Sequence, residues 1–181
     1  MMLRAPAPLD VPLELRAGGL YDGATVIAET APGAFERDVP EPVSFDDAGA
    51  ASAAYRNDSE MFRYCFVCGT ARQDGLGLGP GAVGAGMVAT PWVPDDSLPV
   101  EPTLLWAAMD CPGGWALPEM LERPALLGSM TASVFALPAV GENASWSAPT
   151  RANRDANRSP PRPSTVPTAA CSGGPNRSGS G

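Results

Sequence analysis

The sequence predicts an α+β fold in which one buried helix packs against an antiparallel sheet. From Leu104 to Cys111 every residue except Asp110 is apolar, as in a helix that is buried on all sides. Residues 130–134 alternate apolar and polar side chains, which is typical of a strand with one buried face. The 181 residues and the 44% hydrophobic content leave room for one domain with a core, followed by a tail.

The central helix is expected over residues 102–111. Pro102 stands where a first helical turn favours proline, directly after Glu101. Pro112 lacks the N–H that a helix interior needs, and its ring clashes with the preceding turn. We therefore expect this helix to end or kink near Cys111.

The remaining elements follow from alternation, capping and turn residues. Ser44 is a good N-cap, and Asp46 and Asp47 favour the first turn of a helix. Gly18-Gly19 and Asp22-Gly23 mark turns. In chain order, the pattern predicts strands over 11–16 and 24–29, a helix over 44–55, a glycine-rich loop over 69–86, and strands over 86–92 and 126–135.

Asp110 is the candidate catalytic residue, because it is the only acid in the apolar segment. A carboxylate in apolar surroundings is costly unless it is paired, or its pKa rises. Such a lone acid on a buried helix is typical of a functional site. The alternative is an ordinary aspartate at a helix end, hydrogen-bonded to nearby backbone, and the residues alone leave both interpretations open.

Composition excludes several kinds of chemistry. The chain has no histidine, and its 12 basic residues are all arginine. A histidine-based triad, a histidine metal site, a lysine Schiff base and a P-loop lysine therefore cannot be built from this chain. Acid–base work would fall to carboxylates, cysteine, tyrosine or water, and we expect no cofactor.

Charge and hydropathy indicate a soluble, cytoplasmic protein. The net charge of −8 argues against nucleic-acid binding. No apolar run is long enough for a signal peptide or a membrane span. Cysteines in the cytoplasm are normally reduced, so we expect free thiols and no membrane partner.

The character of the chain changes at Asn143, which separates a domain over 1–142 from a tail over 143–181. The tail holds four of the five asparagines, six prolines and seven serines. It lacks hydrophobic periodicity, so it should remain disordered. Either this tail is native, or it is the product of a truncation or a frameshift.

Cys65-x-x-Cys68 has the spacing of a redox or zinc motif. Structural zinc needs four ligands, and Cys111 and Cys171 are single and scattered along the chain. Two small buried thiols, and no metal site, are the favoured interpretation. The glycines over 75–86 do not fit a dinucleotide fingerprint, and a plain loop is favoured there.

Three segments together resemble the acyl-CoA thioesterases of the hot-dog fold, of the phenylacetyl-CoA thioesterase type. Residues 65–69 (Cys-Phe-Val-Cys-Gly) and 74–78 (Asp-Gly-Leu-Gly-Leu) are similar to the family's "C-F-x-C-G … N-P-x-G-L". Residues 100–115 resemble its central helix, "V-H-G-G-x-x-A-T-L-L-D-E-A-M-G-W". Residues 137–142 (Leu-Pro-Ala-Val-Gly-Glu) are similar to "R-P-V-P-V-G-E". The resemblance covers residues 62–142.

The resemblance implies an antiparallel sheet wrapped around one helix, and two subunits that pair to form sites between them. It places Asp110 on the family's catalytic acid and Trp115 on its closing aromatic residue. The residues it implies for substrate binding are Glu101, Thr103, Trp106, Gly113 and Gly114.

The chain departs from the family at the helix start and after residue 142. The family's histidine is Glu101 here, and the glycine that supplies the oxyanion N–H is Pro102, which has no N–H. An oxyanion donor is worth about 3–4 kcal/mol of transition-state energy. Thr103 would replace it only if the helix start shifts by one residue. The family's last strands have no evident counterpart in 143–181.

Three functional hypotheses follow. The leading one is an acyl-CoA thioesterase-like protein that binds or hydrolyses a thioester near Asp110, as a homodimer or larger homo-oligomer. The second, favoured by Pro102, is a non-catalytic hot-dog domain that binds an acyl-CoA or a protein partner. The third is an incomplete gene product.

Overall fold

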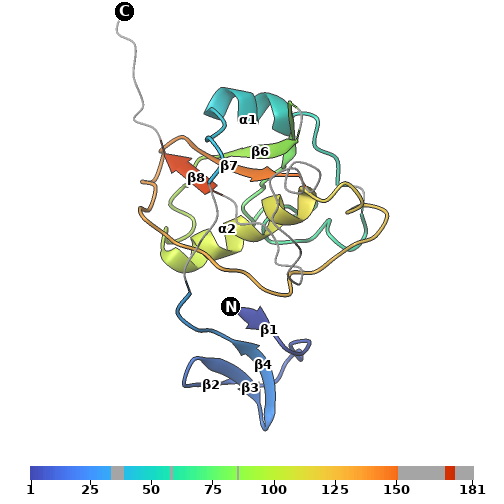
Figure 1. Ribbon diagram of the computed structural model, residues 1–181, viewed down its shortest axis with the longest axis vertical. Helices are drawn as coiled ribbons and strands as arrows, with labels where there is room; N and C mark the ends of the chain where they lie inside the picture. Colours follow the sequence, from blue (N-terminus) through green and yellow to red (C-terminus); the bar gives the residue numbers. More distant parts are fainter. Residues whose placement is uncertain (34–38, 58, 85, 151–169, 174–181) are drawn as a thin grey trace, which may run out of the picture.

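The structure is α+β, with two antiparallel sheets and two helices in the described part of the chain (Figure 1). We analysed a computed structural model, which describes residues 1–33, 39–57, 59–84, 86–150 and the backbone of 170–173. The elements are β1 (Met2–Leu3), β2 (Glu14–Arg16), β3 (Gly19–Asp22), β4 (Thr25–Glu29), α1 (Phe45–Ser52), β5 (Gly81–Val83), β6 (Met87–Trp92), α2 (Pro102–Trp115), β7 (Ala144–Pro149) and β8 (Ala170–Gly173).

The N-terminal sheet has the strand order β1-β4-β3-β2. The strands predicted over 11–16 and 24–29 are present, the first shortened to β2. Strand β3 lies between them in sequence, where only turn residues were expected. It exists because the two turns are tight, and Gly23 takes a φ of +55° at the second one. The three strands therefore form a continuous meander.

The second sheet, ordered β5-β6-β7-β8, lies between the two helices (Figure 1). Thr90 of β6 pairs with Trp146 of β7. Trp146 packs into the main hydrophobic cluster with Leu105 and Met109 of α2. On the opposite face, Ser145 donates a hydrogen bond to the carbonyl of Val43, just before α1, at 2.6 Å. Both faces of β7 are therefore buried.

Two further predictions from the sequence are confirmed. The helix expected over 44–55 is α1, and the Ser44 hydroxyl accepts a hydrogen bond from the Asp47 amide at 3.1 Å. The strand expected over 86–92 is β6. A side-chain cap and an alternating apolar segment are local signals, so both can be recognised from neighbouring residues in the sequence.

The expectation that the central helix ends near Cys111 is wrong. Helix α2 continues through Pro112 to Trp115. Pro112 is buried, and its carbonyl accepts the capping N–H of Ala116 at 3.1 Å. An interior proline costs a helix about 3 kcal/mol, which burial of this turn against the core outweighs.

The prediction of a strand over 126–135 is also wrong. This segment forms a single bridge, between Ser129 and Met2, with flanking backbone hydrogen bonds to the N-terminus. Met130 is buried, but Phe135 is 93% exposed. The alternation that suggested a strand therefore has no continuous face against the core.

The boundary at residue 143 is misplaced as well, because Ala144–Pro149 forms the buried strand β7. Its Ala-Ser-Trp-Ser-Ala pattern is composed mostly of small residues, so it lacks the bulky apolar signal by which strands are recognised. Most of the predicted disordered tail, 151–169 and 174–181, lies outside the described residues. None of the helices that the structure describes is long and apolar enough to cross a membrane.

Candidate functional site

Helix α2 buries one side against the sheet and leaves the other side more open. Successive helical residues are rotated by about 100°, so Leu105, Ala108, Met109 and Pro112 share the buried side. Thr103, Ala107, Asp110 and Gly114 share the opposite side. Thr103 is exposed and the other three are half-buried. We call these four residues the open stripe of α2.

Helix α2 carries all but one of the residues that the family resemblance selects. Asp110, Thr103 and Gly114 lie on the open stripe, and Trp106 lies beside it, half-buried against the core cluster. Gly113 is buried on the side toward the core. Glu101 is the exposed N-cap residue, and its side chain makes no capping hydrogen bond.

Asp110 is a half-buried carboxyl without a hydrogen bond or ion pair among the residues that the structure describes. Helix α2 extends five residues past it. It is therefore not a helix-end aspartate bonded to local backbone, and that alternative is wrong. Burial, and secondarily the negative charge of Cys65, raises the pKa of Asp110 above its ordinary value. An unpaired carboxyl of this kind can accept a proton from a bound water.

The start of α2 offers one free backbone donor. Pro102 is the first helical residue and has no N–H. The amides of Leu104 and Leu105 both donate to the Glu101 carbonyl, at 3.0 and 3.3 Å. The Thr103 N–H has no hydrogen-bond partner among the described residues, which leaves it available for a bound oxygen atom.

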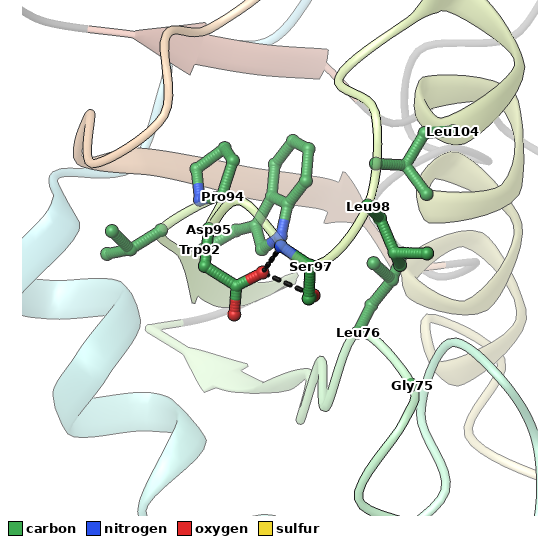
Figure 2. Close-up of a pocket in the computed structure, with 9 residues that line it drawn as sticks. Gly75, Leu76, Trp92, Pro94, Asp95, Ser97, Leu98 and Leu104 are labelled. Carbon is green, nitrogen blue, oxygen red and sulfur yellow. Dashed lines mark hydrogen bonds between the residues drawn. The ribbon is translucent and has the colours of Figure 1, made fainter.

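A small hollow of about 50 Å³ lies near the start of α2 (Figure 2). Leu104 is the only α2 residue in its lining. Figure 2 shows the Asp95 carboxylate hydrogen-bonded to the Ser97 hydroxyl and backbone N–H at its rim. Its other lining residues are Gly75, Leu76, Trp92, Val93, Pro94 and Leu98. The hollow does not include Asp110.

Three cysteines gather beside α2. The sulfur atoms of Cys65, Cys68 and Cys111 all lie within 4.8 Å of one another. The Cys65 and Cys111 sulfurs are 3.6 Å apart. The expectation that Cys111 stands apart from the Cys65-x-x-Cys68 motif is therefore wrong. We call these three residues the thiol cluster.

Hydrogen bonds from Trp115, Tyr55 and Gly69 hold the thiol cluster in place. The indole N–H of Trp115 donates to the Cys68 sulfur at 3.3 Å. Tyr55 packs edge-on against Trp115, with ring centres 5.1 Å apart, and donates its hydroxyl to the Cys68 carbonyl. The Gly69 amide closes the turn onto the Cys65 carbonyl at 2.9 Å. A Cβ at Gly69 would lie 2.5 Å from that same oxygen, so this turn requires glycine.

The thiols of the cluster differ in pKa. Hydrogen bonds from Cys111 and then Cys68 lower the pKa of Cys65 well below its ordinary value. The bond to Cys65, followed by the bond to Cys68 and burial, raises the pKa of Cys111. Cys65 is therefore the most acidic thiol of the group.

Sequence reasoning missed the thiol cluster because Cys65 and Cys111 are 46 positions apart. Pairwise spacing rules recognise ligands that share one turn, and a third ligand from a distant helix carries no such signal. Comparison with known proteins adds no assignment: no protein-family model, curated protein or solved structure matches the chain.

Proposed function

We propose that this chain is a thioesterase-like protein that binds an acyl-CoA thioester along the open stripe of α2, with Asp110 as its catalytic acid–base residue. The proposal rests on one observation above all. Asp110 is a half-buried carboxyl without a partner among the described residues, on the helix that the hot-dog thioesterases use. A structural aspartate in such surroundings would normally be hydrogen-bonded.

The reaction needs a base beside the thioester. The Asp110 carboxylate takes a proton from a water molecule as the water oxygen attacks the thioester carbonyl carbon. The tetrahedral intermediate then breaks its carbon–sulfur bond. The departing CoA thiolate takes up a proton, and the acyl group leaves as a free carboxylic acid.

The packing of α2 against an antiparallel sheet is compatible with a hot-dog layout, which supports the family assignment. Trp146 of β7 and Trp92 of β6 face α2 together, with ring centres 5.9 Å apart. The sheet thus covers the buried side of α2 and leaves Asp110 on the other. Helix α1 occupies the second face of the sheet, so a ligand for Asp110 approaches from the side away from β6 and β7.

The oxyanion donor favours a site shared by two copies of the chain. Thr103 offers the first available N–H of α2, but it lies seven positions before Asp110, which corresponds to about 10 Å along the helix axis. One thioester carbonyl cannot contact both groups in the same chain. Two antiparallel α2 helices from two copies would bring Thr103 of one beside Asp110 of the other.

The alternative function is acyl-CoA binding without turnover, and Pro102 favours it. Loss of one oxyanion donor costs about 3–4 kcal/mol in transition-state energy, which leaves ground-state binding intact. We therefore expect binding to be easily measured and hydrolysis to be slow.

The test combines binding and turnover in the reduced full chain. Calorimetry with a non-hydrolysable thioether analogue of acyl-CoA measures binding, and chromatographic detection of released CoA measures hydrolysis. Asp110→Asn should lower turnover by about 100-fold or more while binding persists. Asp46→Asn, an exposed acid of α1, is the matched control and should change neither quantity. Pro102→Gly, which restores the missing N–H, should raise turnover.

Absence of acyl-CoA binding would refute the proposal, as would turnover that survives Asp110→Asn. The shared site has its own test. Thr103→Pro removes the proposed donor at a position that tolerates proline. When this inactive variant is mixed with Asp110→Asn, paired sites should regain about one quarter of wild-type turnover, because mixed dimers hold one intact site. A mixture without recovery would place the site within one chain.

A further inference from the structure

The thiol cluster suggests a function beyond thioester binding. We propose that Cys65, Cys68 and Cys111 form a three-thiolate site for Zn²⁺, which ties the Cys65-x-x-Cys68 turn to helix α2. The candidate site lies beside the proposed thioester site and does not depend on it.

The spacing of the three sulfurs fits a metal better than a disulfide. Zinc–thiolate bonds are about 2.3 Å long, so two sulfurs on a tetrahedral zinc ion are about 3.8 Å apart. The Cys65 and Cys111 sulfurs are 3.6 Å apart, and all three lie within 4.8 Å. A disulfide needs about 2.05 Å between two sulfurs and would leave the third without a role.

The surroundings favour thiolates, as a metal site requires. The Trp115 indole donates to Cys68 at 3.3 Å. Hydrogen bonds of this kind stabilise the charge on ligand sulfurs and fix their orientation. On binding, Zn²⁺ displaces the remaining thiol protons to solvent.

The three sulfur ligands determine which metal ion the site prefers. Three soft sulfur ligands favour Zn²⁺ over Mg²⁺ or Ca²⁺, which prefer oxygen ligands. The chain contains no histidine, so an imidazole cannot complete the coordination. Cys65 and Cys111 are half-buried, which gives the ion a path from solvent. We assign the fourth position to water, so the site is open in the manner of zinc sites with three protein ligands.

Titration of the reduced, metal-free full chain tests the assignment. Zn²⁺ should bind with a stoichiometry of one per chain by native mass spectrometry. Co²⁺ in its place should show cobalt–thiolate charge-transfer bands and the strong visible bands of a tetrahedral ion. Cys65→Ser, Cys68→Ser and Cys111→Ser should each weaken Zn²⁺ binding by about 100-fold or more.

Two further variants separate ligands from their surroundings. Trp115→Phe removes the N–H donor and keeps an aromatic ring, so it should weaken Zn²⁺ binding by about 10- to 100-fold and keep the tetrahedral cobalt spectrum. Asp46→Asn, which changes an exposed acid of α1, should bind Zn²⁺ like the wild type. Circular dichroism of each variant confirms that the fold is retained.

Three results would overturn the site. The first is a reduced chain that binds no stoichiometric Zn²⁺. The second is undiminished binding in Cys111→Ser, which would reduce the site to the local Cys65-x-x-Cys68 pair. The third is loss of binding in Asp46→Asn equal to that in the three serine variants. None of these results depends on acyl-CoA, so the zinc site and the proposed function can fail separately.

Discussion

Gly81→Ala should destabilise the protein strongly, because β5 and α1 touch through their backbones at this position. A Cβ at Gly81 would lie 1.9 Å from the Ala51 carbonyl oxygen and 2.3 Å from its carbon. An ordinary contact needs about 3.4 Å, so α1 would have to move by more than 1 Å. Overpacking typically costs about 1–3 kcal/mol, and an obstacle made of backbone places this variant at about 3 kcal/mol. For a chain of this size that lowers Tm by roughly 6–12 °C.

Gly49→Ala on α1 is the matched control with the opposite sign. A Cβ there meets no atom within 4 Å, and alanine is favoured over glycine inside a helix by about 0.5–1 kcal/mol. Urea unfolding followed by tryptophan fluorescence should therefore separate the two variants by about 3.5–4 kcal/mol. A Gly81→Ala protein as stable as the wild type would refute the close packing of α1 on β5.

Three further predictions test the core and the site. Trp146→Ala should lower the free energy of unfolding by about 3–5 kcal/mol, because Trp146 is fully buried between β6, β8 and α2, as urea unfolding would show. Ser44→Ala should cost about 1 kcal/mol and shorten α1, detectable as lost helical circular dichroism. In chelator-treated protein, Asp110→Asn should be more stable than the wild type at pH 7, with the gap closing at low pH. Because the pKa of Asp110 is raised, the folded wild type holds a proton on Asp110 that the unfolded chain releases. The free energy of unfolding of the wild type therefore falls as the pH rises above about 3.8. A stability difference between the two proteins that does not change with pH would contradict this.

The sequence predicts the elements whose signals are local. Ser44 caps α1, alternation marks β6, and the apolar run from Leu104 marks α2. Prediction from the sequence fails where tertiary contacts override a local rule. Pro112 is retained inside α2 because its turn is buried, and Ala144–Pro149 becomes a core strand although only Trp146 in it is large.

The two halves of the candidate site differ in the same way. Asp110 stands out in the sequence because one acid interrupts an apolar helix, and the structure places it on the open stripe. The thiol cluster does not stand out, because Cys111 reaches Cys65 only after the loop and α2 have packed together. A contact between two distant segments produces no periodic pattern in the sequence of either segment.

The continuation of α2 past Pro112 positions one part of the thiol cluster. Had α2 ended at Cys111, Trp115 would not lie one helical turn beyond it. Because the helix continues, Cys111 and Trp115 stand four residues apart on the same helix face. From that face Cys111 contacts Cys65, and the Trp115 N–H reaches Cys68. The turn that contains Pro112 therefore positions the hydrogen-bond donor that orients the Cys68 thiol.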